Sequence, residues 1–126
     1  MPGPKDWLYF AESDFIAAKA IINSDDIRIG PILYLVQQSV EKSLKTYLIY
    51  KKHPLKKTHD LVELVKFCAL SDPEFMTLID AANELSPCVS KVRYPDSCFD
   101  MPSVSTAEWA IKKAEMIFDF VANKIL

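Results

Sequence analysis

The sequence predicts an all-α domain, an up-and-down antiparallel bundle of four to five helices, and three observations support this fold class. Apolar residues recur at helical spacing in several long segments, and no segment shows the alternation that is typical of strands. Short polar turns with Pro, Asn and Asp separate these segments. Half of the 126 residues are hydrophobic, enough for one core, so we expect residues 1–126 to form a single domain with 1–4 frayed.

The first helix of this bundle is expected over residues 5–23. Its apolar positions at helical spacing are Trp7, Phe10, Ala11, Phe15, Ala18, Ile21 and Ile22. The carboxylate of Asp14 falls on this same face, where an unpaired buried charge costs free energy. We therefore expect Asp14 to pair with a Lys or Gln of the second helix, such as Lys42 or Lys45, either as a structural salt bridge or within a functional site.

The second helix, expected over residues 31–52, is the predicted centre of the bundle, because it has no internal Gly or Pro and is apolar on two sides. One ridge consists of Leu33, Val36, Val40, Leu44 and Tyr47, and a second ridge, small in its middle, of Ile32, Ser39, Ser43, Thr46 and Tyr50. A partner chain or a fifth helix could cover the surplus apolar surface. The remaining side is polar and carries Gln38, Lys42 and Lys45, with Gln37 and Glu41 at its edge.

Capping signals predict the later helices. The third is expected over about 59–69 with Thr58 as its N-cap, and the fourth from Pro73 to about residue 85, with a possible continuation past Pro87 toward 92. An irregular segment follows, to residue 103. The last helix is expected over about 106–124, after a capping box that begins at Ser105. Its predicted buried residues are Trp109, Ala110, Ala114, Ile117, Phe118 and Val121.

Composition excludes several classes of function. The net charge of −2 gives no general attraction to nucleic acid or anionic membrane, and no apolar run approaches the roughly 20 residues of a membrane span. No signal peptide is apparent, so we expect a cytoplasmic protein. Two glycines are too few for a Walker loop or a dinucleotide-binding turn. Cys68 and Cys88 are expected in the core and Cys98 in a loop, without zinc-ligand spacing, so neither a metal site nor a cofactor is expected.

Five segments stand out in the order WLYFAESDFIAAKAII, QQSVEKSLKTYLI, KTHDLVEL, VRYPD and AEWAIKKAEMIFDFV. Together they cover nearly the whole chain, and the chain resembles the HEPN domain family. The resemblance implies a bundle of four or five helices, commonly a homodimer, that in prokaryotes is often encoded beside a minimal nucleotidyltransferase. Such pairs look like toxin–antitoxin modules. Some branches of the family are ribonucleases, and others have been proposed to bind nucleotides.

The ribonuclease branches carry an Arg, four to six further residues and then a His, a pair suited to proton transfer and phosphate stabilisation. This sequence departs from that motif, because its only arginines are Arg28 and Arg93 and neither is followed by a His at that spacing. The departure favours a role without catalysis. A metal-independent ribonuclease with a variant site, in which Arg93 meets His59 in space, is the alternative.

The positions that match the family's motifs are Gln38, Lys42, Lys45, His59, Arg93, Tyr94 and Asp96. These residues are candidates for binding a nucleotide or phosphate, because cations and a helix N-terminus together can hold a phosphate, and Tyr94 could stack on a base. Structural roles are the alternative: His59 at a helix start, Tyr94 in pinning a loop, and Arg93 in a bridge to Asp14 or Glu41. We expect a dimeric HEPN-like interaction module for a nucleotidyltransferase partner, a nucleotide or RNA; a bare helical scaffold is a third possibility.

Overall fold

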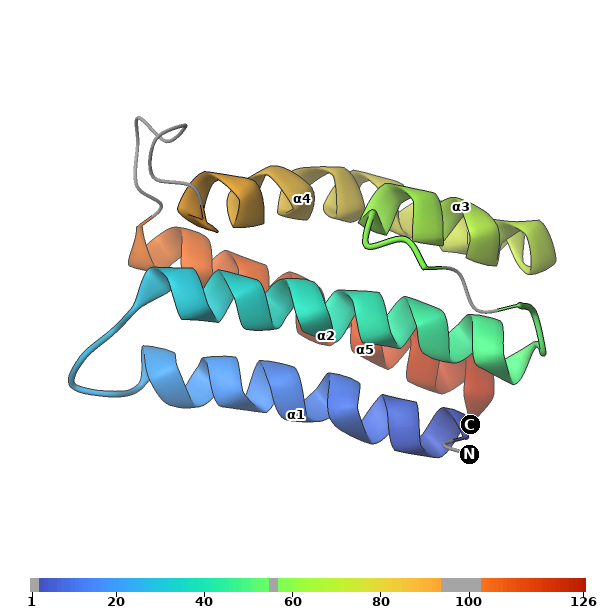
Figure 1. Ribbon diagram of the computed structural model, residues 1–126, viewed down its shortest axis with the longest axis horizontal. Helices are drawn as coiled ribbons and strands as arrows, with labels where there is room; N and C mark the ends of the chain where they lie inside the picture. Colours follow the sequence, from blue (N-terminus) through green and yellow to red (C-terminus); the bar gives the residue numbers. More distant parts are fainter. Residues whose placement is uncertain (1–2, 55–56, 94–102) are drawn as a thin grey trace.

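The computed structural model describes residues 3–54, 57–93 and 103–126, with only the backbone described over 87–93. The described part is an all-α bundle, as predicted (Figure 1). Its elements are α1 (Pro4–Ile22), α2 (Ile29–Tyr50), α3 (Leu61–Ser71), the 3₁₀ helix η1 (Pro73–Leu78), α4 (Ile79–Arg93) and α5 (Val104–Ile125). No strand occurs among these residues.

Helix α2 lies at the centre, between α1 on one side and α3 and α4 on the other, with α5 behind it (Figure 1). Both predicted ridges are buried except for Tyr50, which is exposed at the helix end. The hydroxyl of Ser39 donates to the carbonyl of Ala11 at 2.7 Å, so the backbone of α1 lies directly against the small middle of the second ridge. Helices of the same chain therefore cover both ridges of α2.

Helix α1 buries Ala11, Phe15 and Ala18 as predicted, but it does not bury Phe10. Phe10 is 55% exposed, and Leu8 is buried in its place. The buried row is Leu8, Ala11, Phe15 and Ala18. Since each residue advances about 100° around a helix, Phe10 is turned away from the position of Ala11 toward the outside. The prediction was wrong for Phe10, and this residue becomes part of an exposed apolar face.

The helix starts also differ from the predictions. Asp60, not Thr58, caps α3, because its carboxylate accepts from the Glu63 amide at 3.2 Å. Ser103, not Ser105, caps α5 through the Thr106 amide. The fourth segment begins as η1 rather than as an α-helix, and the backbone of α4 then continues without a break to residue 93.

Aromatic side chains join the elements of the core. Phe75 of η1 lies 4.4 Å from Tyr47 of α2 and 5.0 Å from Phe120 of α5, measured between ring centroids. Cys68 is buried on α3, as predicted, and its thiol contacts the carbonyl of Leu44. The side chains of the other two cysteines lie outside the described residues.

Candidate functional site

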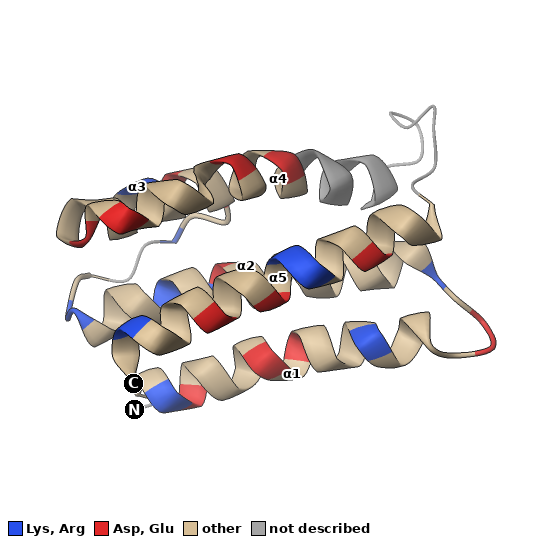
Figure 2. Cartoon of the chain, turned by 180° about the vertical axis from the view of Figure 1, so that it is seen from behind, with Lys and Arg blue, Asp and Glu red and all other residues tan. Residues whose placement is uncertain are grey.

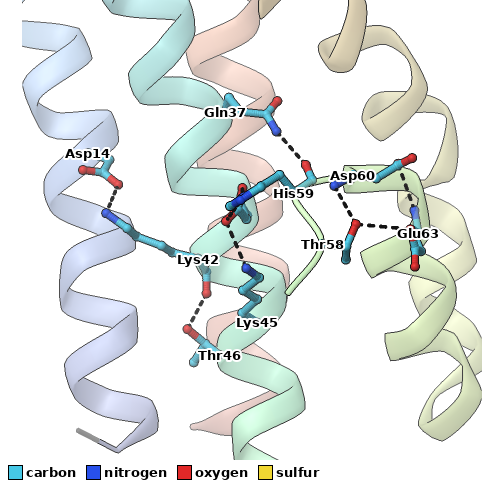
Figure 3. A network of polar contacts seen from close by, with 10 residues as sticks. Asp14, Gln37, Lys42, Lys45, Thr46, Thr58, His59, Asp60 and Glu63 are labelled. Carbon is cyan, nitrogen blue, oxygen red and sulfur yellow. Dashed lines mark hydrogen bonds and ion pairs between the residues drawn. The ribbon is translucent and has the colours of Figure 1, made fainter. Parts of the chain in front are cut away.

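The polar side of α2 faces the viewer in Figure 3, with α1 on one side of it and the segment that leads into α3 on the other. This side of α2 carries a buried ion pair. The ammonium of Lys45 is 3.1 Å from the carboxylate of Glu41, and the two side chains are only 9% and 8% exposed. Their spacing of four residues places them one turn apart on the same face of the helix.

His59 reaches this carboxylate from the connecting segment. Its Nδ1 lies 3.0 Å from each oxygen of Glu41, while 78% of the side chain is exposed. The amide of Gln37 donates to the backbone carbonyl of His59 at 3.0 Å. The ring and the backbone of His59 are therefore each tied to α2, one turn apart, and Figure 3 shows both contacts.

A second ion pair links α2 to α1. The ammonium of Lys42 lies 2.8 Å from the carboxylate of Asp14, and both side chains are partly buried. The expected pairing of Asp14 with a lysine of the central helix is confirmed, and Lys42 is the partner. Since Lys45 pairs with Glu41, each lysine of the predicted phosphate site already has a carboxylate at ion-pair distance.

The structure thus brings Lys45 and His59 together at one carboxylate, with Lys42 on the α1 side of the same surface. Gln38 is half-buried on α2. Arg93 is the last residue of α4, and its side chain is not described; Tyr94 and Asp96 lie outside the described residues. Whether Arg93 approaches His59, Asp14 or Glu41 is therefore a prediction that this structure does not address.

Glu41 was predicted at the edge of the polar side of the second helix, whereas in the structure it contacts both Lys45 and His59. The i, i+4 spacing of Glu41 and Lys45 was a visible signal for an ion pair. Nothing in the sequence indicated that this pair is buried, because both residues lie on the polar side of the predicted helix. The contact with His59 spans 18 residues and no local pattern predicts it.

The described residues limit the functions that this surface can have. In the view of Figure 2, acidic and basic positions are interspersed along the described helices, which gives no single stretch of basic residues for a nucleic-acid backbone. Among the described residues, no three His, Cys, Asp or Glu side chains lie close enough to hold a metal ion. None of the described helices is long and apolar enough to cross a membrane.

Comparisons with known proteins agree with this architecture. No curated protein matches the chain. Among solved structures, the crystal structure of ST0689, an archaeal HEPN homologue, matches with a TM-score of 0.77 over 100% of both chains at 22% sequence identity, which shows a common fold. Residues 4–125 match the HEPN domain family, in agreement with the resemblance of the five sequence segments. The chain therefore belongs to the HEPN domain family.

Proposed function

We propose that this chain is a HEPN-like interaction module that forms a homodimer and binds a minimal nucleotidyltransferase, a nucleotide or both, in a toxin–antitoxin-like system. Family membership supports the proposal, because HEPN domains commonly dimerise. The observation that carries the dimer is the exposed apolar side of α1. Large exposed apolar patches on soluble proteins mark interaction surfaces.

This α1 outer face consists of Tyr9, Phe10, Ser13, Ile16, Ala17 and Ala20. Its three large side chains are the most exposed apolar residues within any described helix apart from Leu70: Tyr9 is 66%, Phe10 is 55% and Ile16 is 53% exposed. The rings of Tyr9 and Phe10 contact each other edge to face, with centroids 5.6 Å apart. The face therefore offers aromatic surface at one end and small residues in the middle.

A second copy of the chain fits this face. Two such helices packed antiparallel about Ser13 would place Ser13 of both copies at the centre, with Phe10 of each copy facing Ile16 of the other and Tyr9 facing Ala17. A two-fold interface requires this kind of self-complementary face. The six residues carry no charge that a partner of opposite sign could recognise. One helix face is smaller than the roughly 800 Å² per partner of a standard interface, so we expect dissociation at micromolar concentrations.

Sedimentation velocity at protein concentrations from about 1 to about 100 µM, the range set by a micromolar dissociation constant, tests the dimer. We expect a shift from one-chain to two-chain mass, and Phe10→Asp is expected to remain at one-chain mass. Met116→Asp, which places the same charge at an exposed apolar position of α5, is the matched control. A one-chain mass throughout the range, or equal effects of the two variants, would contradict the proposal.

The ligand part of the proposal uses the motif residues Gln38, Lys42, Lys45, His59, Arg93, Tyr94 and Asp96. Calorimetric titration with the cognate nucleotidyltransferase and with ATP measures both kinds of binding. We expect His59→Ala and Arg93→Ala to weaken binding and Lys112→Ala, at an exposed site on α5, to leave it unchanged. Absence of binding to either ligand would remove this role, while equal behaviour of all three variants would favour a bare scaffold.

A metal-independent ribonuclease is the second candidate, and the exposed ring of His59, held at Nδ1 by Glu41, favours it. Imidazole is the side chain best suited to proton transfer near neutral pH. The test is incubation with labelled RNA in the presence of a chelator. Cleavage that is lost in both His59→Ala and Arg93→Ala supports the enzyme, and cleavage that survives both substitutions comes from a contaminant.

A further inference from the structure

We infer that Glu41 is the positioning residue of the site: it fixes His59 in the tautomer that presents an unprotonated Nε2 at the surface, as an acceptor for a hydroxyl group of a ligand. The inference concerns a residue that the family motifs do not single out. Its ligand class, a ribose hydroxyl, rests on the proposed function. The position of the proton on the His59 ring does not rest on that function, since it follows from the contact between Nδ1 and Glu41.

The first step is the position of the proton. Nδ1 of His59 is 3.0 Å from both Oε1 and Oε2 of Glu41. An ionised carboxylate can only accept hydrogen bonds, and the ammonium of Lys45, which can only donate, lies 3.1 Å from the same carboxylate. Nδ1 therefore carries the hydrogen. In a neutral imidazole the other nitrogen, Nε2, then has a free lone pair.

The second step is the rigidity of the pair. The carboxylate of Glu41 lies within α2 and is held by Lys45 at 3.1 Å, and Gln37 holds the carbonyl of His59 at 3.0 Å. The ring is thus oriented by side chains of a long helix rather than by its own connecting segment. Groups supported in this way from a regular element keep their geometry better than groups on a loop.

The third step concerns the structural alternative, in which His59 serves the start of α3. That role is already filled. The carboxylate of Asp60 accepts from the Glu63 amide, and the hydroxyl of Thr58 accepts from the Asp60 amide at 3.1 Å. The His59 ring points instead to α2, with most of its surface in solvent. Capping of α3 does not require this orientation.

The chemistry of the free nitrogen defines the ligand class. Nε2 can accept a hydrogen bond or a proton from a hydroxyl group, and the charge of Glu41 stabilises the imidazolium that would form. A phosphate is a poorer match at this position, because the adjacent cation Lys45 is buried and paired with Glu41. A ribose hydroxyl is the group of a nucleotide or RNA that meets this requirement.

The second histidine of the chain provides an internal control. Nε2 of His53 lies 2.6 Å from the hydroxyl of Ser71, so the nitrogen that is free in His59 is engaged in His53. Diethylpyrocarbonate reacts with unprotonated imidazole nitrogen. It therefore reports the difference between the two rings without any knowledge of the natural ligand.

The experiment combines ¹⁵N NMR of the histidine rings with the rate of carbethoxylation at each histidine, in the full chain at pH 8. We expect the Nδ1–H tautomer for His59 and faster modification of His59 than of His53. Glu41→Gln is expected to weaken the tautomer preference and to slow modification of His59 about fivefold, the scale of one ordinary hydrogen bond. Glu12→Gln, at an exposed position on α1, should change neither.

An Nε2–H tautomer in the unmodified protein would overturn the inference, as would unchanged tautomer and rate in a folded Glu41→Gln variant. Circular dichroism checks that the Glu41→Gln variant is folded, so that a changed tautomer reports the loss of the contact between Nδ1 and the carboxylate. Titration with adenosine and with its 2′,3′-dideoxy analogue tests the ligand class. Shifts of the His59 signals with adenosine but not with the analogue support a ribose hydroxyl as the ligand. Equal shifts with both compounds, or no shifts, overturn this assignment. The tautomer measurement tests the role of Glu41 independently of the ligand.

Discussion

Replacement of Lys45 by Met should destabilise the fold strongly, because it leaves the carboxylate of Glu41 buried without its ammonium partner. The two groups are 3.1 Å apart and their side chains are less than a tenth exposed. Removal of one partner of a buried pair costs about 3–5 kcal/mol. His59 remains as a partner at 3.0 Å, so we expect the lower end, about 3 kcal/mol.

Urea unfolding followed by circular dichroism at pH 7 measures this loss. With an m-value of about 2 kcal/mol/M, a loss of about 3 kcal/mol moves the midpoint down by about 1.5 M. The matched control is Arg28→Ala, which breaks the largely exposed pair of Arg28 with Asp26. Exposed pairs contribute about 0–1 kcal/mol, so this variant should unfold close to the parent protein.

The double variant Glu41→Leu/Lys45→Met shows whether the loss of stability in Lys45→Met comes from the unpaired charge of Glu41 or from changed packing. Apolar residues of similar volume in place of a buried ion pair are often neutral or stabilising, so the double variant should be more stable than Lys45→Met alone. A Lys45→Met variant that unfolds at the same midpoint as Arg28→Ala would refute the buried pair. A double variant whose loss equals the sum of both single losses would show that the two groups do not interact.

Three further predictions concern other parts of the bundle. Ser39→Val should cost about 1–3 kcal/mol in urea unfolding, because the larger side chain meets the α1 backbone that Ser39 contacts at 2.7 Å; stability equal to the parent would mean that α1 has room to move. Lys124→Met should lower the urea midpoint at pH 7 but not in strong acid. The hydrogen bond from Lys124 holds the pKa of Asp72 below 3.8, so this stabilisation is present above pH 3.8 and is lost as the pH falls through the folded-state pKa; an equal effect at both pH values would contradict the pairing. Burial raises the pKa of the Cys68 thiol to about 12, so in a variant with the other two cysteines replaced by Ser, a thiol reagent should label the chain no faster than it unfolds, and fast labelling of folded protein would show that Cys68 is accessible.

The fold could be predicted from the sequence because the helical spacing of apolar residues and the polar turns between these segments both indicate a helical bundle. The apolar spacing of α2 predicted its central position, and the small residues around Ser39 leave room for the close approach of α1. Helix ends were less predictable, because the starts of α3 and α5 each offer two candidate caps that lie two residues apart. The choice between Thr58 and Asp60 depends on which side chain reaches the amide of Glu63 in three dimensions.

The candidate site could be predicted only in part from the sequence. The polar strip of α2 and the pairing of Asp14 with a lysine followed from helical spacing and from the cost of an unpaired charge. The central position of Glu41 did not, because its contact with His59 joins residues 18 positions apart in the sequence, which no local pattern predicts. Phe10 was misplaced for a related reason: spacing identifies an apolar residue, but only the packed neighbours of α1 decide which side faces the core.

The buried pair on α2 has a physical meaning beyond its own stability. Taking two charges out of water costs several kcal/mol per ion, and an apolar pair of similar size would fill the same space at no such cost. Glu41 and Lys45 therefore do not maximise the stability of the bundle. Their arrangement does give His59 a fixed carboxylate at 3.0 Å beneath an exposed ring. If the double variant Glu41→Leu/Lys45→Met is as stable as the parent yet loses the tautomer preference of His59, the pair serves the site rather than the fold.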